Sequence, residues 1–212
     1  MKTSMSDYHN VPGNFEDKYN TKNPIAKVLM NGFLRSFRDL LEMNVEVKTI
    51  LEAGAGEGYL TKIVAEKYPS ARIYAGDIED EMNRIAKKDL ASYKNVMIQK
   101  ENVQDLSYKK ETFDLVICCE VLEHVPEPEK ALKSIHHVLK KGGNALLSVP
   151  HEPFWRILNM IRGKYIKDFG NTPGHINHWA SSSFASMVTK SGLHLIKSNH
   201  PLPWTMVLVT KE

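Results

Sequence analysis

Short apolar runs alternate with longer amphipathic segments along most of the chain. The short runs have the length and the flanking turn residues typical of strands, whereas the longer segments repeat apolar residues at helical spacing. Strands are predicted at 47–54, 71–77, 95–102, 113–120 and 144–150. Helices are predicted at 23–44, 59–69, 80–93 and 128–143. In the last of these helices, Lys140 and Lys141 are expected to lie beside the carbonyl end, and two glycines then end the helix.

This alternation of strands and helices predicts the fold class. Strands separated by helices of this length pair in parallel through crossover connections, and the helices then cover both faces of the sheet. After one further helix, the last two strands are joined by the short Pro201–Pro203 loop, which leaves no room for a crossover and predicts an antiparallel hairpin. The fold class is therefore α/β, with a mostly parallel sheet closed by a hairpin.

The stretch 151–178 interrupts the pattern. It contains an aromatic helix candidate at 153–163 and then a loop rich in glycine and histidine. We expect an insertion that lies over the edge of the sheet. Its aromatic residues Phe154, Trp155 and Tyr165 are candidates both for the lining of a ligand pocket and for a small core inside the insertion.

Composition and charge narrow the class of protein. A chain of 212 residues that is 42% hydrophobic fits one domain with a substantial core. Lys and Arg number 28 against 25 Asp and Glu and are scattered, so the sequence indicates no surface for nucleic acid. No signal segment and no run of roughly 18 apolar residues is present, so we expect a soluble, cytoplasmic protein without a membrane span.

The two cysteines, Cys118 and Cys119, are adjacent within the predicted strand 113–120. Successive side chains of a strand point to opposite faces, so these two thiols point away from each other and cannot form a disulfide together. We interpret them as reduced residues of the core.

Polar groups and glycines follow the predicted strands. Gly54, Gly56 and Gly58 stand at alternate positions after the first strand, a spacing that differs from the dinucleotide motif G-x-G-x-x-G, and no G-K-[ST] is present to hold a triphosphate. Asp77 follows the second strand, where a carboxylate can accept hydrogen bonds from ribose hydroxyls or cap the next helix. Because the carboxyl ends of parallel strands meet at one edge of the sheet, we expect the ligand site there.

Three ionisable side chains, Glu120, Glu123 and His124, stand directly behind the fourth predicted strand. In a helical segment, positions three and four apart share a face, so the three groups would converge on one point. Such a convergence suits a catalytic site, although a solvated helix start has the same composition.

In order and spacing, these motifs resemble the class I S-adenosylmethionine-dependent methyltransferases. The resemblance is carried by 47–65, 74–78, 101–106, 113–132 and 139–150. It is close over 47–150 and loose over the terminal hairpin. It implies a Rossmann-like sheet of seven strands, in the order 3-2-1-4-5-7-6 with strand 7 antiparallel, and this order agrees with the hairpin predicted from the Pro201–Pro203 loop.

The resemblance implies S-adenosylmethionine as the cofactor and assigns contacts to it. The implied contacts are Glu52, Gly54, Ala55, Gly56 and Gly58 at the methionine part, Asp77 at the ribose, and Ile78 at the adenine. Where the family commonly has an acidic residue near the adenine, this chain has Asn102, followed by Val103; the amide oxygen of Asn102 can still accept a hydrogen bond. Glu120 would meet both the methionine end and the substrate.

Three interpretations of the Glu-x-x-Glu-His stretch stay open. It is common in the family for packing and capping alone. Alternatively, His124 is a general base beside Glu120, since an unperturbed histidine has a pKa of about 6.5. Thirdly, Glu120, Glu123, His124 and the distant His175 resemble the metal ligands of small-RNA 2′-O-methyltransferases, and the motif is similar to that of the O-methyltransferases of ubiquinone synthesis. Clusters such as His175, His178 and Trp179, which close a loop over the sheet, are more often structural than catalytic.

The resemblance implies methyl transfer to a small-molecule acceptor. We expect the acceptor atom to be an oxygen. The alternatives are a metal-assisted RNA 2′-O-methyltransferase, which the scattered charge disfavours, and a cofactor-binding partner subunit without activity. We expect one methyltransferase domain over 1–212. Its parts are a helical lid at 1–46, the cofactor-binding core at 47–150, the insertion over the acceptor site at 151–178, and a helix and hairpin at 179–212.

Overall fold

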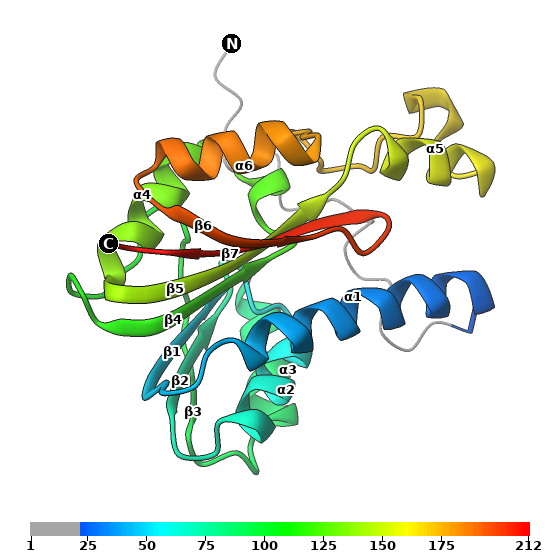
Figure 1. Ribbon diagram of the computed structural model, residues 1–212. Coiled ribbons are helices and arrows are strands. Elements are labelled where there is room, and N and C mark those ends of the chain that lie inside the picture. Colours follow the sequence, from blue (N-terminus) through cyan, green and yellow to red (C-terminus); the bar gives the residue numbers. More distant parts are fainter. Residues whose placement is uncertain (1–21) are drawn as a thin grey trace.

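A computed structural model describes residues 22–212. Its centre is a seven-stranded sheet of order β3-β2-β1-β4-β5-β7-β6, drawn in Figure 1. β1 pairs in parallel with β2 and β4, whereas β7 runs antiparallel to both of its neighbours, β5 and β6. The predicted fold class, strand order and antiparallel seventh strand are confirmed.

The strands are β1 (Thr49–Ala53), β2 (Arg72–Gly76), β3 (Val96–Ile98), β4 (Phe113–Cys119), β5 (Leu139–Pro150), β6 (His194–Asn199) and β7 (Trp204–Thr210). The α-helices are α1 (Pro24–Glu42), α2 (Tyr59–Lys67), α3 (Asp80–Asp89), α4 (Pro128–Val138), α5 (Phe154–Ile161) and α6 (Ser181–Lys190). Two 3₁₀ turns complete the described elements, η2 (Leu122–His124) and η3 (Ile166–Asp168). Among residues 22–212, no helix is both long and apolar enough to cross a membrane.

Each face of the sheet carries its own apolar core. One core contains buried side chains of α1 and α2, and the other contains buried side chains of α4 and α6. Alternate residues of β4 divide between the two cores, so that Cys118 lies in one and Cys119 in the other. Both cysteines are buried and free, as their adjacent positions in a strand predicted.

Helix α1 covers one face of the sheet. The side-chain oxygen of Asn23 accepts hydrogen bonds from the N–H groups of Ile25 and Ala26, which caps the helix start. Phe33 and Phe37 are buried in the core, so this helix is part of the sheet covering. Residues 1–21 of the predicted N-terminal lid lie outside the described residues, and the lid stays a prediction.

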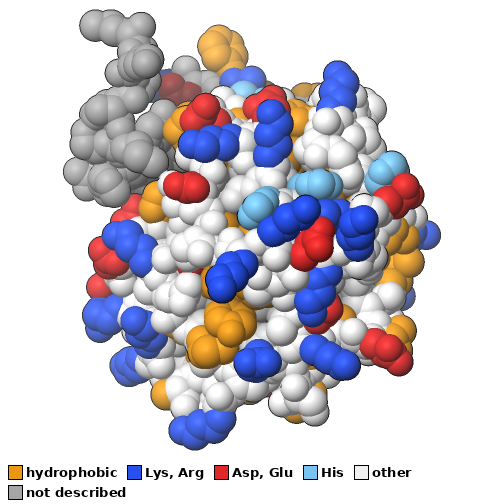
Figure 2. All heavy atoms as spheres, turned by 90° about the vertical axis from the view of Figure 1, so that its left-hand side faces the viewer, with side chains coloured by type: hydrophobic (Ala, Val, Ile, Leu, Met, Phe, Trp, Pro, Cys, Tyr) orange, Lys and Arg blue, Asp and Glu red, His pale blue; other side chains and the backbone are white. Residues whose placement is uncertain are grey.

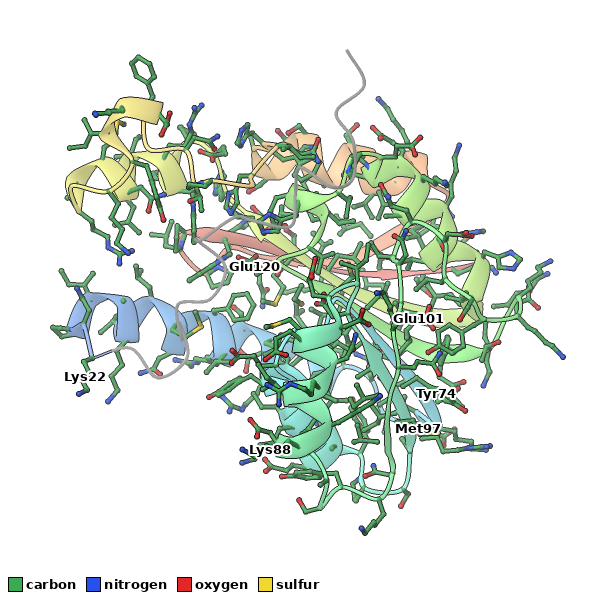
Figure 3. All side chains as sticks on the ribbon, turned by 180° about the vertical axis from the view of Figure 1, so that it is seen from behind. Lys22, Tyr74, Lys88, Met97, Glu101 and Glu120 are labelled. Atoms are coloured by element: carbon green, nitrogen blue, oxygen red, sulfur yellow. The ribbon has the colours of Figure 1, made fainter. Side chains whose placement is uncertain are left out.

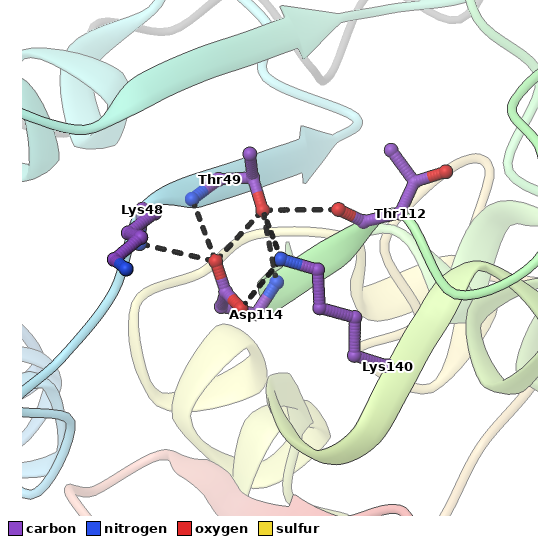
Figure 4. Close-up of polar contacts among 5 residues, drawn as sticks. All are labelled: Lys48, Thr49, Thr112, Asp114 and Lys140. Carbon is purple, nitrogen blue, oxygen red and sulfur yellow. Dashed lines mark hydrogen bonds and ion pairs between the residues drawn. The ribbon is translucent and has the colours of Figure 1, made fainter.

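A polar network at the amino ends of the strands fixes the register of β1 against β4 (Figure 4). Asp114 Oδ2 accepts hydrogen bonds from the N–H groups of Lys48 and Thr49 and from the Thr49 hydroxyl. Its Oδ1 pairs with Lys140 Nζ at 2.8 Å. Burial raises the pKa of Asp114, but these hydrogen bonds outweigh burial and hold the pKa below its usual range.

Lys140 and Lys141 do not lie at the carbonyl end of a helix, so the predicted end of that helix was wrong. α4 ends at Val138, and β5 begins at Leu139. Lys140 reaches Asp114 instead, and Lys211 Nζ donates a hydrogen bond of 2.8 Å to the carbonyl of Leu139. The ion pair across the sheet therefore replaces the expected contact with the helix end.

The insertion contains α5, within the predicted helix 153–163, and the turn η3. Its two ends meet, because His151 and Trp179 form an isolated parallel β-bridge. Figure 1 shows α5 projecting beyond the end of β5 at the right of the view, toward which the first turns of α1 also extend.

Candidate functional site

The carboxyl ends of β1 and β2 bring the glycine bend against Asp77. The N–H groups of Gly54 and Ala55 donate to the carbonyl of Gly76 at 2.8 and 3.0 Å. The N–H of Gly56 donates to Asp77 Oδ2 at 3.0 Å. These predicted cofactor residues therefore lie together at one edge of the sheet, the edge at which Figure 3 shows Glu101 and Glu120.

The three glycines of the bend have different neighbours. All three have positive φ angles, of +80° for Gly54, +53° for Gly56 and +84° for Gly58. A Cβ atom on Gly54 would lie 2.2 Å from Val121, and one on Gly58 would lie 2.7 Å from Leu90. A Cβ atom on Gly56 would meet no heavy atom of the described chain within 4 Å. Gly54 and Gly58 thus serve close packing, whereas Gly56 borders open space.

Glu52, in the last part of β1, is a buried carboxyl group. Thr61 of α2 donates a hydrogen bond of 2.5 Å to its Oε2. Burial raises the pKa of Glu52 to about 8; the Thr61 hydrogen bond opposes this rise and the charge of Asp77 adds to it. Without a neighbouring cation, Glu52 is therefore mainly protonated at neutral pH.

Asp77 is held by the loop that follows β2. Its Oδ1 accepts a hydrogen bond from the N–H of Glu79, and Asn83 bonds both the N–H and the carbonyl of Asp77. The N-cap position of α3 is Glu79, so Asp77 does not fill the helix-capping role that the sequence left open. Each carboxylate oxygen can accept a further hydrogen bond. Ile78 beside it is 41% exposed and offers an apolar surface.

At the end of β3, the structure adds a carboxylate that the sequence analysis did not single out. Glu101 is buried and accepts hydrogen bonds from Gln99 Nε2 and from the Ser107 hydroxyl. The N–H of Glu101 donates to the carbonyl of Asp77, which joins the loops after β2 and β3. Only its place beside Asn102, at a strand end, could have drawn attention to it.

The two predicted adenine contacts follow Glu101. The side-chain oxygen of Asn102 accepts a hydrogen bond of 3.0 Å from the N–H of Gln104, and one lone pair of this amide oxygen can accept another. Val103 is buried in the apolar core. Both residues thus lie in the loop that adjoins Asp77 through Glu101.

Glu120 follows β4 and turns toward β5 and β7. Its backbone is left-handed, with φ +60°. The Ser148 hydroxyl donates to Oε1 at 3.2 Å, and the indole N–H of Trp204 donates to Oε2 at 2.6 Å. Trp204 packs against Phe33 of α1, with ring centroids 5.1 Å apart. Glu120 therefore belongs to a contact between β4, β5, β7 and α1, and the role of Trp204 was not predicted.

Glu123, His124 and His175 lie close together. Their ligand atoms are all within 4.8 Å of one another, and Glu120 lies outside this group among the described residues. The predicted helical face fails here, because the left-handed Glu120 follows β4 and only the short turn η2 comes after it. The structure therefore brings together three of the four predicted metal ligands.

Hydrogen bonds hold the insertion loop against η2. His124 Nδ1 lies 2.9 Å from the carbonyl of Gly174, so Nδ1 carries the donated proton. The N–H groups of Ile176 and Asn177 donate to the carbonyl of Glu123. In a neutral His124, Nε2 is then a lone-pair donor, 3.9 Å from Glu123 Oε1.

The aromatic residues of the insertion differ in their surroundings. Trp155 stacks on His175, with centroids 5.7 Å apart, and its indole N–H donates to the Thr172 hydroxyl. Phe154, by contrast, is 50% exposed and contributes to no internal core. His178 lies 3.6 Å from Glu152, outside the Glu123–His124–His175 group.

Comparisons with known proteins show the family of the chain. The family model described as "Methyltransferase domain" matches residues 28–198. The ubiquinone biosynthesis O-methyltransferase of Coxiella burnetii is 25% identical over 173 residues, which cover 76% of this chain and 71% of that protein. The protein of the same name from Xanthomonas oryzae is 34% identical over 120 residues, covering 55% of this chain and 49% of that protein.

Among solved structures, the fold is similar to that of an S-adenosylmethionine-dependent methyltransferase from Aquifex aeolicus. The TM-score is 0.69 at 16% identity, and the match covers 90% of this chain and 94% of the other. Since the family match spans most of the chain and the sheet order is that of the expected fold, the chain belongs to the class I S-adenosylmethionine-dependent methyltransferases and is an enzyme of that family.

Proposed function

We propose that this methyltransferase transfers the methyl group of S-adenosylmethionine to a hydroxyl oxygen of a small-molecule acceptor. The observation that carries the proposal is the histidine–carboxylate group of Glu123, His124 and His175 beside the predicted cofactor edge. A hydroxyl acceptor must lose a proton during transfer, and this group offers a base for it. The similarity to proteins named ubiquinone biosynthesis O-methyltransferase supports the same acceptor atom.

We assign the cofactor to the edge built by the glycine bend and Asp77. The residues proposed to hold it are Glu52, Gly54, Ala55, Gly56, Gly58, Asp77, Ile78, Asn102, Val103 and Glu120. The open space at Gly56 supports this assignment, because a ligand can approach the backbone there. Asp77 retains acceptor capacity for two ribose hydroxyls, and the exposed side chain of Ile78 suits an adenine ring.

When bound, S-adenosylmethionine supplies an electrophilic methyl group on a sulfonium cation. The protein then has to position the acceptor oxygen, exclude water and take up a proton. His124 suits the last task, because Gly174 fixes its ring through Nδ1 and leaves Nε2 as the basic atom. We propose Glu120, bound to Ser148 and Trp204, as a positioning residue on the β4 side of the acceptor.

A divalent metal at Glu123, His124 and His175 is the second candidate for proton removal. Two imidazoles and a carboxylate are donors that suit such an ion, and all three offer ligand atoms within 4.8 Å. A bound divalent ion would lower the pKa of the acceptor hydroxyl. Glu120 is left out of this proposal, because it lies outside the group of ligand atoms within 4.8 Å of one another.

The acceptor proposal is tested with methyl-labelled S-adenosylmethionine and a panel of phenols and catechols, run beside panels of amines and short RNA. We expect label in a methyl ether, identified by mass spectrometry. Label in RNA alone would overturn the small-molecule proposal. Cofactor binding without transfer to any panel would indicate a partner subunit without activity. Figure 2, which views the molecule from the side where the parallel strands begin, shows both basic and acidic side chains on that face. The net charge of the whole chain is only +3, which favours the small molecule over RNA.

The metal is tested by direct binding of Mn²⁺, followed by electron paramagnetic resonance, and by activity in EDTA. His175→Asn should weaken Mn²⁺ binding at least tenfold, whereas His178→Asn, outside the group, should leave it unchanged. Full activity in EDTA together with loss of activity in His124→Asn, at unchanged cofactor affinity, would instead assign His124 as the general base.

A further inference from the structure

Residues 154–170, which comprise α5, η3 and the turns around them, form a projecting unit that we call the α5 knob (Figure 1). Its centre is polar. Within α5 the buried residue is Asn159, whose side-chain N–H groups donate to the carbonyl of Gly170 and to the Thr172 hydroxyl. A Cβ atom on Gly170 would lie 2.1 Å from the carbonyl oxygen of Arg156, so the two segments of the knob pack backbone against backbone.

The outer surface of the knob is apolar. Its exposed apolar side chains are Phe154 (50%), Ile157 (42%), Met160 (38%), Ile161 (77%), Ile166 (62%) and Phe169 (76%). Positions 154, 157 and 161 share one helical face, opposite the face that carries Trp155 and Asn159. A polar centre with an apolar exterior is the reverse of an ordinary folded unit, and it marks a surface that contacts an apolar partner.

The α5 knob is also basic in composition. The knob contains Arg156, Arg162, Lys164 and Lys167 against one acidic residue, Asp168. Its net charge of +3 equals that of the whole chain, although it holds 17 of the 212 residues. Exposed apolar tips among basic residues suit the boundary between the acyl chains and the anionic headgroups of a lipid bilayer.

A protein interface fits the knob less well. Stable interfaces use roughly 20–30 residues on each side. The knob has 17 residues, and Trp155 and Asn159 face inward. Apolar exposure continues instead at Leu202, 55% exposed in the β6–β7 turn, which Figure 1 places on the same side of the molecule. The α5 knob and the β6–β7 turn, which both carry exposed apolar side chains, therefore lie on one side of the molecule.

We propose that the α5 knob docks this methyltransferase onto anionic lipid membranes, with its apolar side chains at the acyl boundary and its basic residues at the headgroups. The knob adjoins the end of β5 and, through Trp155 and His175, the candidate site. Docking would therefore bring the site close to the membrane surface. This docking proposal does not depend on the identity of the methyl acceptor, because lipid binding is measured without cofactor and without methyl transfer.

The test is co-sedimentation of the full chain with vesicles of phosphatidylcholine, with and without phosphatidylglycerol. We expect binding that needs phosphatidylglycerol and weakens with added salt. Ile161→Ser with Phe169→Ser should reduce binding roughly tenfold or more. The matched control, Leu195→Ser with Ile196→Ser on β6, removes side chains that are 45% and 43% exposed and should bind as the wild type does.

Arg162→Glu with Lys167→Glu tests the electrostatic part without touching the apolar side chains, and it should abolish the preference for phosphatidylglycerol. Wild-type protein that ignores anionic vesicles would overturn the proposal. Equal losses in the two serine double variants would also overturn it. Analytical ultracentrifugation gives a third check: a dimer that only the knob variants convert to a monomer would assign the surface to a second copy of the chain.

Discussion

Gly56 combines a left-handed backbone with open space beside its Cα. A substitution there should therefore have a small effect on folding and a larger effect on cofactor binding. Gly56→Ala should reduce the free energy of unfolding by about 1 kcal/mol, through backbone strain, and weaken S-adenosylmethionine binding at least tenfold, through loss of space. The measurements are denaturant unfolding and calorimetric titration.

The control for this prediction is Gly142→Ala. Gly142 has φ +74°, and a Cβ atom there would also meet nothing within 4 Å among the residues that the structure describes. Gly142 lies in the first part of β5, at the amino ends of the strands, so its strain should be similar while cofactor affinity is unchanged. Equal loss of affinity in the two variants would contradict the assignment of Gly56.

Glu52 makes stability depend on pH. Its pKa is about 8 in the folded protein, against about 4.3 in an unfolded chain. Because the folded pKa is the higher one, the stabilising contribution is full below the unfolded pKa and is lost as pH rises through about 8. Glu52→Gln should flatten the decline in unfolding free energy between the unfolded and the folded pKa of Glu52, measured by denaturant unfolding without cofactor. The control variant Glu129→Gln, at an exposed position, should keep the wild-type decline. A similar slope in the wild type and in both variants would refute the prediction.

Cofactor binding should reverse this protonation. A cationic ligand near Glu52 favours the carboxylate, so binding at neutral pH should release a proton. The affinity should then rise with pH up to about 8 and level off above it. Titration calorimetry in buffers of different ionisation enthalpy would detect the proton, and Glu52→Gln should release none.

At the scale of elements, Asp114 links three strands that are distant in the chain. Asp114→Ala leaves the N–H groups of Lys48 and Thr49 and the ammonium of Lys140 without this acceptor. The loss of unfolding free energy should be about 2 kcal/mol. The lowered pKa of Asp114 means that its contribution is present above pH about 3.9 and is lost as pH falls through the folded pKa.

Denaturant unfolding at two pH values measures both parts of the Asp114 prediction. Asp105→Ala is the control, because Asp105 is exposed and lies in a loop away from the strand starts. A change in Asp114→Ala no larger than in Asp105→Ala would contradict the predicted contribution of the network of Figure 4 to stability.

Local pattern predicted the elements better than it predicted their ends. Hydrophobic periodicity located the strands and helices, because each of them buries one face or stripe. It did not locate the end of α4, since the contact that draws Lys140 away comes from Asp114, 26 residues earlier. The convergence of Glu120 with Glu123 failed for a similar reason, because no sequence pattern reveals the left-handed turn at Glu120.

For the whole molecule, motif order predicted the sheet, and the sheet then determined which loops meet. Gly56 and Asp77 lie together because β1 and β2 are parallel neighbours. Trp204 and Glu101 escaped prediction, since Trp204 stands in no motif and the contacts of the two residues with Glu120 and Asp77 exist only after folding. Burial also decides the protonation of Glu52, and the sequence does not show which carboxyl groups are buried.

The bridge between His151 and Trp179 has a consequence for how such an enzyme can change. Because the two ends of the insertion are already side by side, the segment between them can be replaced by a longer or shorter one without shifting β5 or α6. A lineage that exchanged this segment would also exchange Gly174 and His175, so a new substrate preference would arrive together with new surroundings for His124.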